Sequence, residues 1–323
     1  MAEHPALTGK EAAGNTPEKR EKGAGTLPVS VWVIVGAAAA FYLVFIWRTA
    51  FRIGGITYFT LVDDAMVSMR YAQHLARGYG LVWNIGQKPV EGFTNPAWML
   101  TMTLFHLLPL PTSMPSLGMM MLSAVILLAN VVVVYRIAAA LRPASQIAAL
   151  AAAALTAFYF PLVFWALRGM EVGLLVLLID SAVLLAIQMK TEATREAVLI
   201  GVLLALAVLT RLDAIIQASI IVAYLAVRGI RGKSLLLPLL IVVMTAAAIL
   251  LFQRLYFGDF LPNTYYQKMA GTAIWERVRN GMLVFYQHAL WDTALPALVS
   301  LACLLAYKDL RRPETFLLAA LFS

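Results

Sequence analysis

Acidic and basic side chains that could take part in chemistry lie close together after the first apolar run. Asp63 and Asp64 are adjacent, and Arg70, His74 and Arg77 follow within fourteen residues. Asp63 could be the N-terminal cap of a helix that ends at a glycine fifteen residues later. Capping would explain Asp63 but not Asp64 beside it. Spacings of seven, eleven and fourteen residues from Asp63 return the three basic residues to nearly one stripe of that helix. The segment therefore presents acids and bases side by side, and His74 is expected to be a solvated residue of this helix.

A second polar segment, YFGDFLPNTYYQKM, follows a later apolar run. Gly258 and Pro262 break the helix, and the side chains of Asn263, Tyr265 and Lys268 follow the break. Aromatic rings beside a lysine suit the lipid headgroup layer, or a site for a sugar and an anionic lipid. Tyrosines of an aromatic belt are the alternative interpretation.

Shorter polar connections hold further candidates. Glu171 lies in ALRGME, and Arg211 with Asp213 lies in LTRLD, where snorkelling arginines are the alternative to phosphate binding. Asp180 is nine residues after Glu171, a rotation of about 180° on one helix, so these two acids cannot form a dyad. Glu91 lies in KPVEGFTNPAW, a turn-rich segment in which an ordinary loop acid is equally expected.

The composition shows what kind of chain must position these residues. Of 323 residues, 62% are apolar and 13% are charged, whereas a soluble chain carries about 25% charged residues. An integral membrane protein is therefore expected. Its 25 Lys and Arg are spread over connections between apolar runs, so they indicate orientation and not nucleic-acid binding. A single Cys and four His exclude a disulfide framework and a multi-cysteine zinc site.

The order of apolar runs predicts an all-α polytopic bundle. Residues 1–27 are polar and without periodicity, which predicts a disordered cytoplasmic tail, and residues 28–323 form the membrane domain. About eight spans and a truncated ninth are expected, and the apolar stretch Ala97–Leu110 is interpreted as re-entrant or interfacial. The other runs are Pro28–Trp47, Pro115–Tyr135, Gln146–Leu167, Glu171–Met189, Leu235–Tyr256, Ala294–Tyr307, and a helical hairpin formed by Ala197–Thr210 and Ala214–Val227.

Two long outer loops, 48–96 and 254–292, carry most of the candidate residues. The short connections on the other side each carry two or three Lys or Arg, whereas the short outer loops carry one each. Because positive residues in short loops stay on the cytoplasmic side, the N-terminus is expected to be cytoplasmic. The first long loop is expected to hold amphipathic, juxtamembrane helices on the outer, periplasmic side of the inner membrane.

The segment VDDAMVSMRYAQHLARGYGLVWNIGQKPVEGFTNPAW resembles the first outer loop of GT-C class membrane glycosyltransferases. Such enzymes use polyprenyl-phosphate sugars, and the bacterial arabinofuranosyltransferase-like branch is the most similar. GDFLPNTYYQKM, ALRGMEVGLL and LTRLD resemble three further segments of that branch, in the same order. GMEV lacks the branch's usual Thr after the Glu, and LTRLD lacks its usual Pro. The resemblance covers residues 62 to 269.

The resemblance implies an inverting transferase that moves a sugar, arabinofuranose in that branch, to a glycan, lipid or protein acceptor of the cell envelope. Either Asp63 or Asp64 would be the base that deprotonates the acceptor hydroxyl. A divalent Mg²⁺ or Mn²⁺, if one is used, would be held by Asp64 and Glu171. The residues expected to bind the donor phosphate or the substrate are Arg70, Glu91, Asn95, Arg211, Asp213, Asn263, Tyr265 and Lys268.

Two other functions fit the same composition. A flippase or transporter of lipid-linked sugars would also need cations for the phosphate, but its polar residues would be expected to continue through the membrane interior. A non-enzymatic membrane assembly protein could keep the fold, although retention of both Asp63 and Asp64 argues against it.

Overall fold

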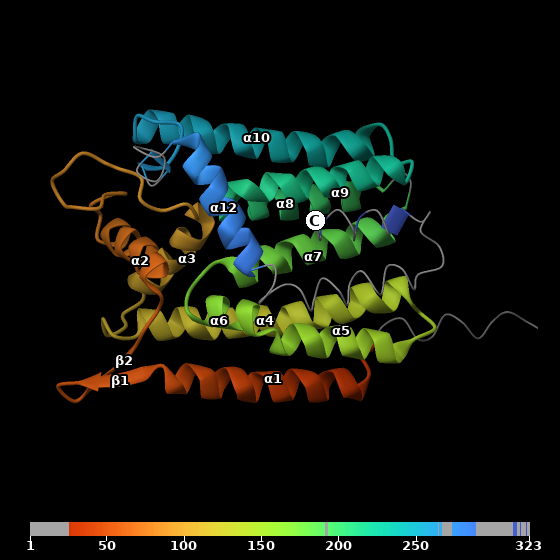
Figure 1. Ribbon diagram of the computed structural model, residues 1–323, viewed down its shortest axis with the longest axis horizontal. Helices are drawn as coiled ribbons and strands as arrows, with labels where there is room; N and C mark the ends of the chain where they lie inside the picture. Colours follow the sequence, from red (N-terminus) through yellow and green to blue (C-terminus); the bar gives the residue numbers. More distant parts are fainter. Residues whose placement is uncertain are drawn as a thin grey trace, which may run out of the picture.

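The computed structural model describes residues 26–190, 193–263, 265–266 and 273–288, together with residues 313, 314, 317 and 321. This described part is mostly helical, in agreement with the predicted fold class. The long helices lie with roughly parallel axes, and the elements formed by residues 50–107 gather at one end of them (Figure 1). Lys268, the predicted span Ala294–Tyr307 and nearly all of the predicted N-terminal tail lie outside the described residues.

Three helices are long and apolar enough to cross a membrane: α1 (Val29–Arg48), α4 (Pro115–Leu141) and α10 (Lys233–Tyr256). At about 1.5 Å per residue, each reaches the roughly 30 Å of a bilayer core. Two shorter apolar helices are α7 (Val172–Gln188) and α9 (Ile215–Val227), the latter preceded by the single turn η1 (Leu212–Ala214). All five fall on predicted apolar runs.

One predicted span is broken. The run Gln146–Leu167 forms α5 (Gln146–Phe158) and α6 (Phe160–Leu167), which are bent by 45° at Tyr159. Pro161 lies in the first turn of α6, where its missing N–H is tolerated, but its ring would clash with the preceding turn of a continuous helix. The proline therefore explains the bend, which apolarity alone did not predict.

The predicted helical hairpin is formed by α8 (Thr194–Thr210) and α9. Its polar turn reaches the start of α7, because Arg211 Nη1 lies 2.9 Å from Glu171 Oε1. At the other end, Arg228 Nη1 donates to the carbonyl oxygens of Ala186 and Ile187 in the last turn of α7. The two ends of the hairpin are thus tied to opposite ends of α7, and the polar turn lies where it was expected.

A small β-hairpin corrects the all-α prediction. Strands β1 (Ala50–Ile53) and β2 (Ile56–Phe59) pair antiparallel, with Ala50 opposite Phe59. The two turn residues, Gly54 and Gly55, have φ values of 56° and 83°. A two-residue turn with both φ values positive favours glycine and matches the twist of the strands. The Gly-Gly pair between β-branched and aromatic residues was the overlooked signal.

Two short helices pack together at the end of the bundle that carries this hairpin. They are α2 (Asp63–Ala76) and α3 (Pro96–Leu107). At about 1.5 Å per residue, the twelve residues of α3 extend only ~18 Å, too short to cross a bilayer core. A further helix, α12 (Ile274–His288), lies within the predicted outer loop 254–292. Its side chains are largely exposed.

The bundle has two apolar cores. One lies among α1 to α6 and includes the fully buried Tyr42, Trp98 and Met120. The other lies among α7 to α10 and includes Ile200 and Leu204. The loops that carry the polar residues cross between these two halves at the end where α2 and α3 lie (Figure 1).

Candidate functional site

A chain of hydrogen bonds, buried at one end and exposed at the other, joins three of the polar segments. Ser68 of α2 donates to Asn95 Oδ1 at 2.8 Å, and Asn95 Nδ2 donates to Glu171 Oε2 at 2.8 Å. The other carboxylate oxygen of Glu171 accepts from Arg211 Nη1 at 2.9 Å. Asp213 completes the chain, because it accepts from Arg211 Nη2 at 2.8 Å and from Nε at 3.0 Å. Segments up to 145 positions apart in the sequence thus form one network.

The charges in this network are unevenly buried. The Glu171 side chain is 1% exposed, whereas the side chains of Arg211 and Asp213 are 34% and 59% exposed. The hydrogen-bonded guanidinium of Arg211 lowers the pKa of Asp213 below its ordinary value. Arg211 was expected to hold the donor phosphate, but two carboxylates already engage its Nε, Nη1 and Nη2. This geometry favours a positioning role for Arg211.

Asp63 and Asp64 lie in the first turn of α2, and both are exposed. The helix cap is Val62, which makes no side-chain capping bond, so the expectation that Asp63 caps the helix was wrong. Among the described residues, neither carboxylate has a hydrogen-bond or ion-pair partner. Both are therefore free to accept a proton.

The two acids face different sides of α2. Asp64 is one turn before Ser68 and lies on the face that carries the Asn95–Glu171 network. Asp63 lines a separate cavity of about 630 Å³ that also contains Arg70 and His74. The predicted stripe is therefore confirmed for these three residues, and Asp64 is the acid nearer to the buried network.

The basic residues of α2 are bound to the loop that follows the helix. Arg70 donates from Nε to the Trp83 carbonyl and from Nη2 to Asn84, and its guanidinium lies 4.3 Å from the centre of the Trp83 ring. His74 was expected to be solvated, but it is buried, with Nδ1 2.8 Å from the Val82 carbonyl oxygen. Arg70 thus shapes the loop, and a substrate contact from it stays a prediction.

The loop between α6 and α7 is pressed against α2. The Val62 N–H donates to the Arg168 carbonyl at 2.9 Å, and Trp98 Nε1 donates to the Gly169 carbonyl at 2.8 Å. Gly169 has a φ of 94°, and a Cβ there would lie 2.9 Å from Leu61. Both its conformation and its surroundings therefore require glycine. Arg168 Nε is buried and has no hydrogen-bond partner within the described part of the chain.

The fourth segment, around GDFLPN, reaches the site through the backbone. The Asn263 N–H donates to the Glu91 carbonyl at 3.0 Å. Tyr265 is 44% exposed and its ring contacts that of Tyr266 edge to face. Hydrogen bonds thus link all four segments on which the family resemblance rests, each to at least one other, although Lys268 lies outside the described residues.

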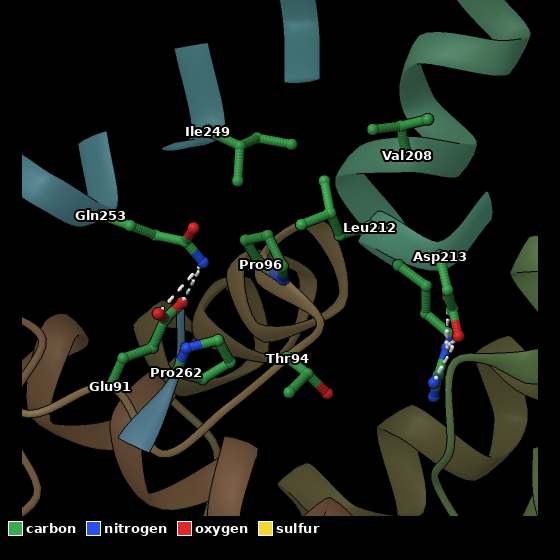
Figure 2. A pocket seen from close by; sticks show the side chains of 10 residues that line it. Glu91, Thr94, Pro96, Val208, Leu212, Asp213, Ile249, Gln253 and Pro262 are labelled. Carbon is green, nitrogen blue, oxygen red and sulfur yellow. Dashed lines mark hydrogen bonds and ion pairs between the residues drawn. The ribbon is translucent and has the colours of Figure 1, made fainter. Parts of the chain in front are cut away.

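Sequence reasoning missed Gln253, in the last turns of α10. Its Nε2 donates to both carboxylate oxygens of Glu91, at 3.1 and 3.0 Å. The two side chains border a cavity of about 190 Å³ between α10, the start of α3 and the turn that carries Arg211 (Figure 2). An amide within an apolar span is a functional candidate by default, so its sequence position was an available signal.

Glu91 is 5% exposed, and burial raises its pKa, an effect that the Gln253 amide partly opposes. Because the pKa is higher in the folded chain, the contribution of Glu91 to stability is full below its unfolded pKa of about 4.3 and is lost as the pH rises through the folded value. We expect Glu91→Gln to remove that loss. The Tm of the variant relative to wild type should then increase over the pH range that begins at about 4.3.

Thermal unfolding of the purified protein in detergent at stepped pH measures this effect. The matched control is Glu276→Gln, which changes an exposed carboxylate on α12. A Tm difference between Glu91→Gln and wild type that stays constant across this pH range would contradict the prediction.

The residues proposed to hold a metal ion do not fit one. Glu171 uses both carboxylate oxygens to accept from Asn95 and Arg211, so a divalent cation there would face a guanidinium. Within the described ranges, no group of three or more His, Cys, Asp or Glu side chains could hold a metal ion. The geometry therefore favours a structural role for Glu171.

No protein-family model matches the chain, and no curated protein matches it significantly.

Proposed function

We propose that the protein is an inverting, polyprenyl-phosphate-sugar-dependent glycosyltransferase of the inner membrane. One observation carries the proposal: four polar segments, separated by long apolar helices, meet at one end of the bundle. They are linked by Asn95, Glu171 and Arg211 and by the backbone bond from Asn263 to Glu91. One free carboxylate, that of Asp64, lies on the face of α2 that carries Ser68 of this network, and transfer to a hydroxyl requires such a base.

The chemistry assigns each group a task. An acceptor hydroxyl oxygen attacks the anomeric carbon of the donor sugar and forms the new glycosidic bond. The bond from that carbon to the phosphate oxygen breaks on the opposite face, and its electron pair leaves with the polyprenyl phosphate. The hydroxyl proton passes to Asp64, a step that general-base catalysis accelerates by about 10²–10⁴-fold.

Cations must stabilise the leaving phosphate. Arg168 is suited to this, because its Nε lacks a hydrogen-bond partner among the described residues and its backbone is bonded to the segment that begins α2. Lys268 remains a second candidate by sequence. Arg211 and Glu171 hold the loops in place around this position.

The polar end of the bundle is proposed to face the periplasm. The connections at the other end carry paired or triple positive charges: Arg136 and Arg142, Lys190 and Arg195, and Arg228, Arg231 and Lys233. That distribution is typical of cytoplasmic loops. A donor whose phosphate stays at the outer bilayer surface would then place its sugar beside α2.

Cysteine labelling tests this orientation. In a Cys303→Ser background, Lys88→Cys at the polar end should react with an impermeant thiol reagent in intact cells, whereas Arg231→Cys should react only after permeabilisation. Both positions are exposed and both replace a basic residue, so they form a matched pair. The reverse labelling pattern would mean that the site faces the cytoplasm.

A transfer assay tests the activity itself. The purified full chain, given a radiolabelled polyprenyl-phosphate pentose or hexose and a cell-envelope glycan acceptor, should release free polyprenyl phosphate and a labelled product. Movement of the labelled lipid from one leaflet of a proteoliposome membrane to the other, without release of the sugar, would instead favour a flippase.

A further inference from the structure

The cavity of about 190 Å³ beside Gln253 has polar side chains on two flanks and apolar side chains between them. Glu91 and Gln253 lie on one flank, and Asp213 lies on the other (Figure 2). Arg211, which also lines the cavity, is paired with Asp213. Ile249 and further apolar side chains line the space between the two flanks: Val208, Leu212, Pro96 and Pro262. One water molecule occupies about 30 Å³ in the liquid, so this volume corresponds to several water molecules. A single small ring fits in that space.

Gln253 carries an unsatisfied acceptor at this cavity. The residue is 6% exposed, and its Oε1 is buried with no hydrogen-bond partner among the described residues. The amide orientation is determined by Glu91, because the reverse orientation would place a carbonyl oxygen against a carboxylate. Figure 2 shows Oε1 on the side of the amide away from Glu91. Buried acceptors are rarely left without a donor, so a ligand that brings one is expected.

The surroundings define the chemistry of that ligand. Glu91 already accepts two hydrogen bonds from Gln253, and Arg211 lies between the carboxylates of Asp213 and Glu171. A strongly charged ligand would therefore gain little here. A neutral ring with hydroxyl donors on its edge and C–H groups on its face would satisfy Gln253 Oε1 and pack against the apolar wall.

We propose that this cavity binds the sugar ring of the lipid-linked donor and that Gln253 Oε1 accepts a hydrogen bond from one ring hydroxyl. Glu91 orients the amide and does not itself contact the ring. The inference rests on the proposed transferase function, and it names the residue that distinguishes a sugar-bearing donor from bare polyprenyl phosphate.

Equilibrium binding to the purified full chain in nanodiscs tests the assignment with two probes, polyprenyl-phosphate arabinofuranose and polyprenyl phosphate. Wild type should bind the first about tenfold more tightly than the second, and Gln253→Leu should lose that preference while binding polyprenyl phosphate unchanged. The matched control is Gln217→Leu on α9. Gln217 Oε1 is also buried without a partner among the described residues, but it does not line this cavity.

A deoxy-sugar series identifies the hydrogen bond directly. Among monodeoxy donors, one should bind wild type about tenfold more weakly than the parent donor, and that difference should disappear in Gln253→Leu. Should Gln253→Leu fail to fold, Ile249→Phe fills the same cavity without replacing the amide and should also abolish the preference for the sugar.

The outcomes separate this inference from the transferase proposal. Equal binding of the two probes by wild type, or a preference that survives both Gln253→Leu and Ile249→Phe, would overturn the sugar assignment even if transfer occurs. Loss of the preference in Gln253→Leu would support the sugar assignment. If that loss is observed but no transfer is detected, only the transferase proposal fails.

Discussion

Asp64→Asn is expected to lower the rate of sugar transfer by about 10²–10⁴-fold, because it removes the base and preserves the shape of the side chain. Asp64 is exposed, unpaired within the described residues, and on the face of α2 that carries Ser68, the residue that donates to Asn95. Asp63 lines the larger cavity on another face, so Asp63→Asn should have a smaller effect. The Asp64→Asn variant should bind the donor with nearly the wild-type affinity.

Release of polyprenyl phosphate by purified variants at saturating donor measures the difference. Since the first turn of a helix favours negative charge by only about 0.3–1 kcal/mol, both variants should retain nearly the wild-type Tm. Glu276→Gln on α12 is the control for loss of an exposed carboxylate. Transfer by Asp64→Asn at the wild-type rate, with Asp63→Asn inactive, would reassign the base to the larger cavity.

Arg211→Met is expected to lower the free energy of unfolding by about 3 kcal/mol, the low end of the range for a broken buried ion pair. The reason is that Glu171, 1% exposed, would lose its countercharge while staying buried. Glu171→Gln should cost less, about 1 kcal/mol, because Arg211 keeps its bonds to Asp213 and remains partly in water. The asymmetry follows from the unequal burial of the two partners.

The double variant Arg211→Met with Glu171→Gln should be more stable than the sum of the single changes predicts, by about 1–2 kcal/mol. The free energy of unfolding of all three variants can be measured by following the loss of the helical circular dichroism signal as a denaturing detergent is added. Asp213→Asn is the control, since its carboxylate is mostly exposed and its loss leaves the contact between Arg211 and Glu171 intact. Equal destabilisation by both single variants would show that Glu171 is more accessible to water than its burial indicates.

The helices and the polar segments were largely predictable from the sequence. The apolar runs predicted the positions of α1, α4, α7 and α10. A long apolar segment that is removed from water must satisfy its backbone hydrogen bonds internally, and a helix does this within one segment. The bend at Pro161 and the hairpin at Gly54 were missed, although proline and paired glycines are local signals. Both features depend on one or two residues, whereas the apolar character of a span is a property of about twenty residues.

The pairing of residues was not predictable. The bonds from Glu171 to Asn95 and Arg211 join residues 76 and 40 positions apart, and the Gln253–Glu91 pair spans 162 positions. Nothing in local composition distinguishes a carboxylate that meets an arginine from one that remains in water. As a result, His74 was expected to be solvated, whereas the fold buries it. Arg211 was expected to bind phosphate, and the sequence did not indicate that it pairs with Glu171 and Asp213.

For this protein, the amino-acid order determined an apolar helical chain with its acids and bases confined to a few connections, since periodicity and residue type act over one or two turns. Only the tertiary structure decided which of those groups neutralise one another and which stay free. It buried Glu171 against Arg211, left Asp63 and Asp64 exposed, and turned Gln253 toward Glu91, because burial and charge pairing depend on neighbours that the chain brings together only when the helices pack.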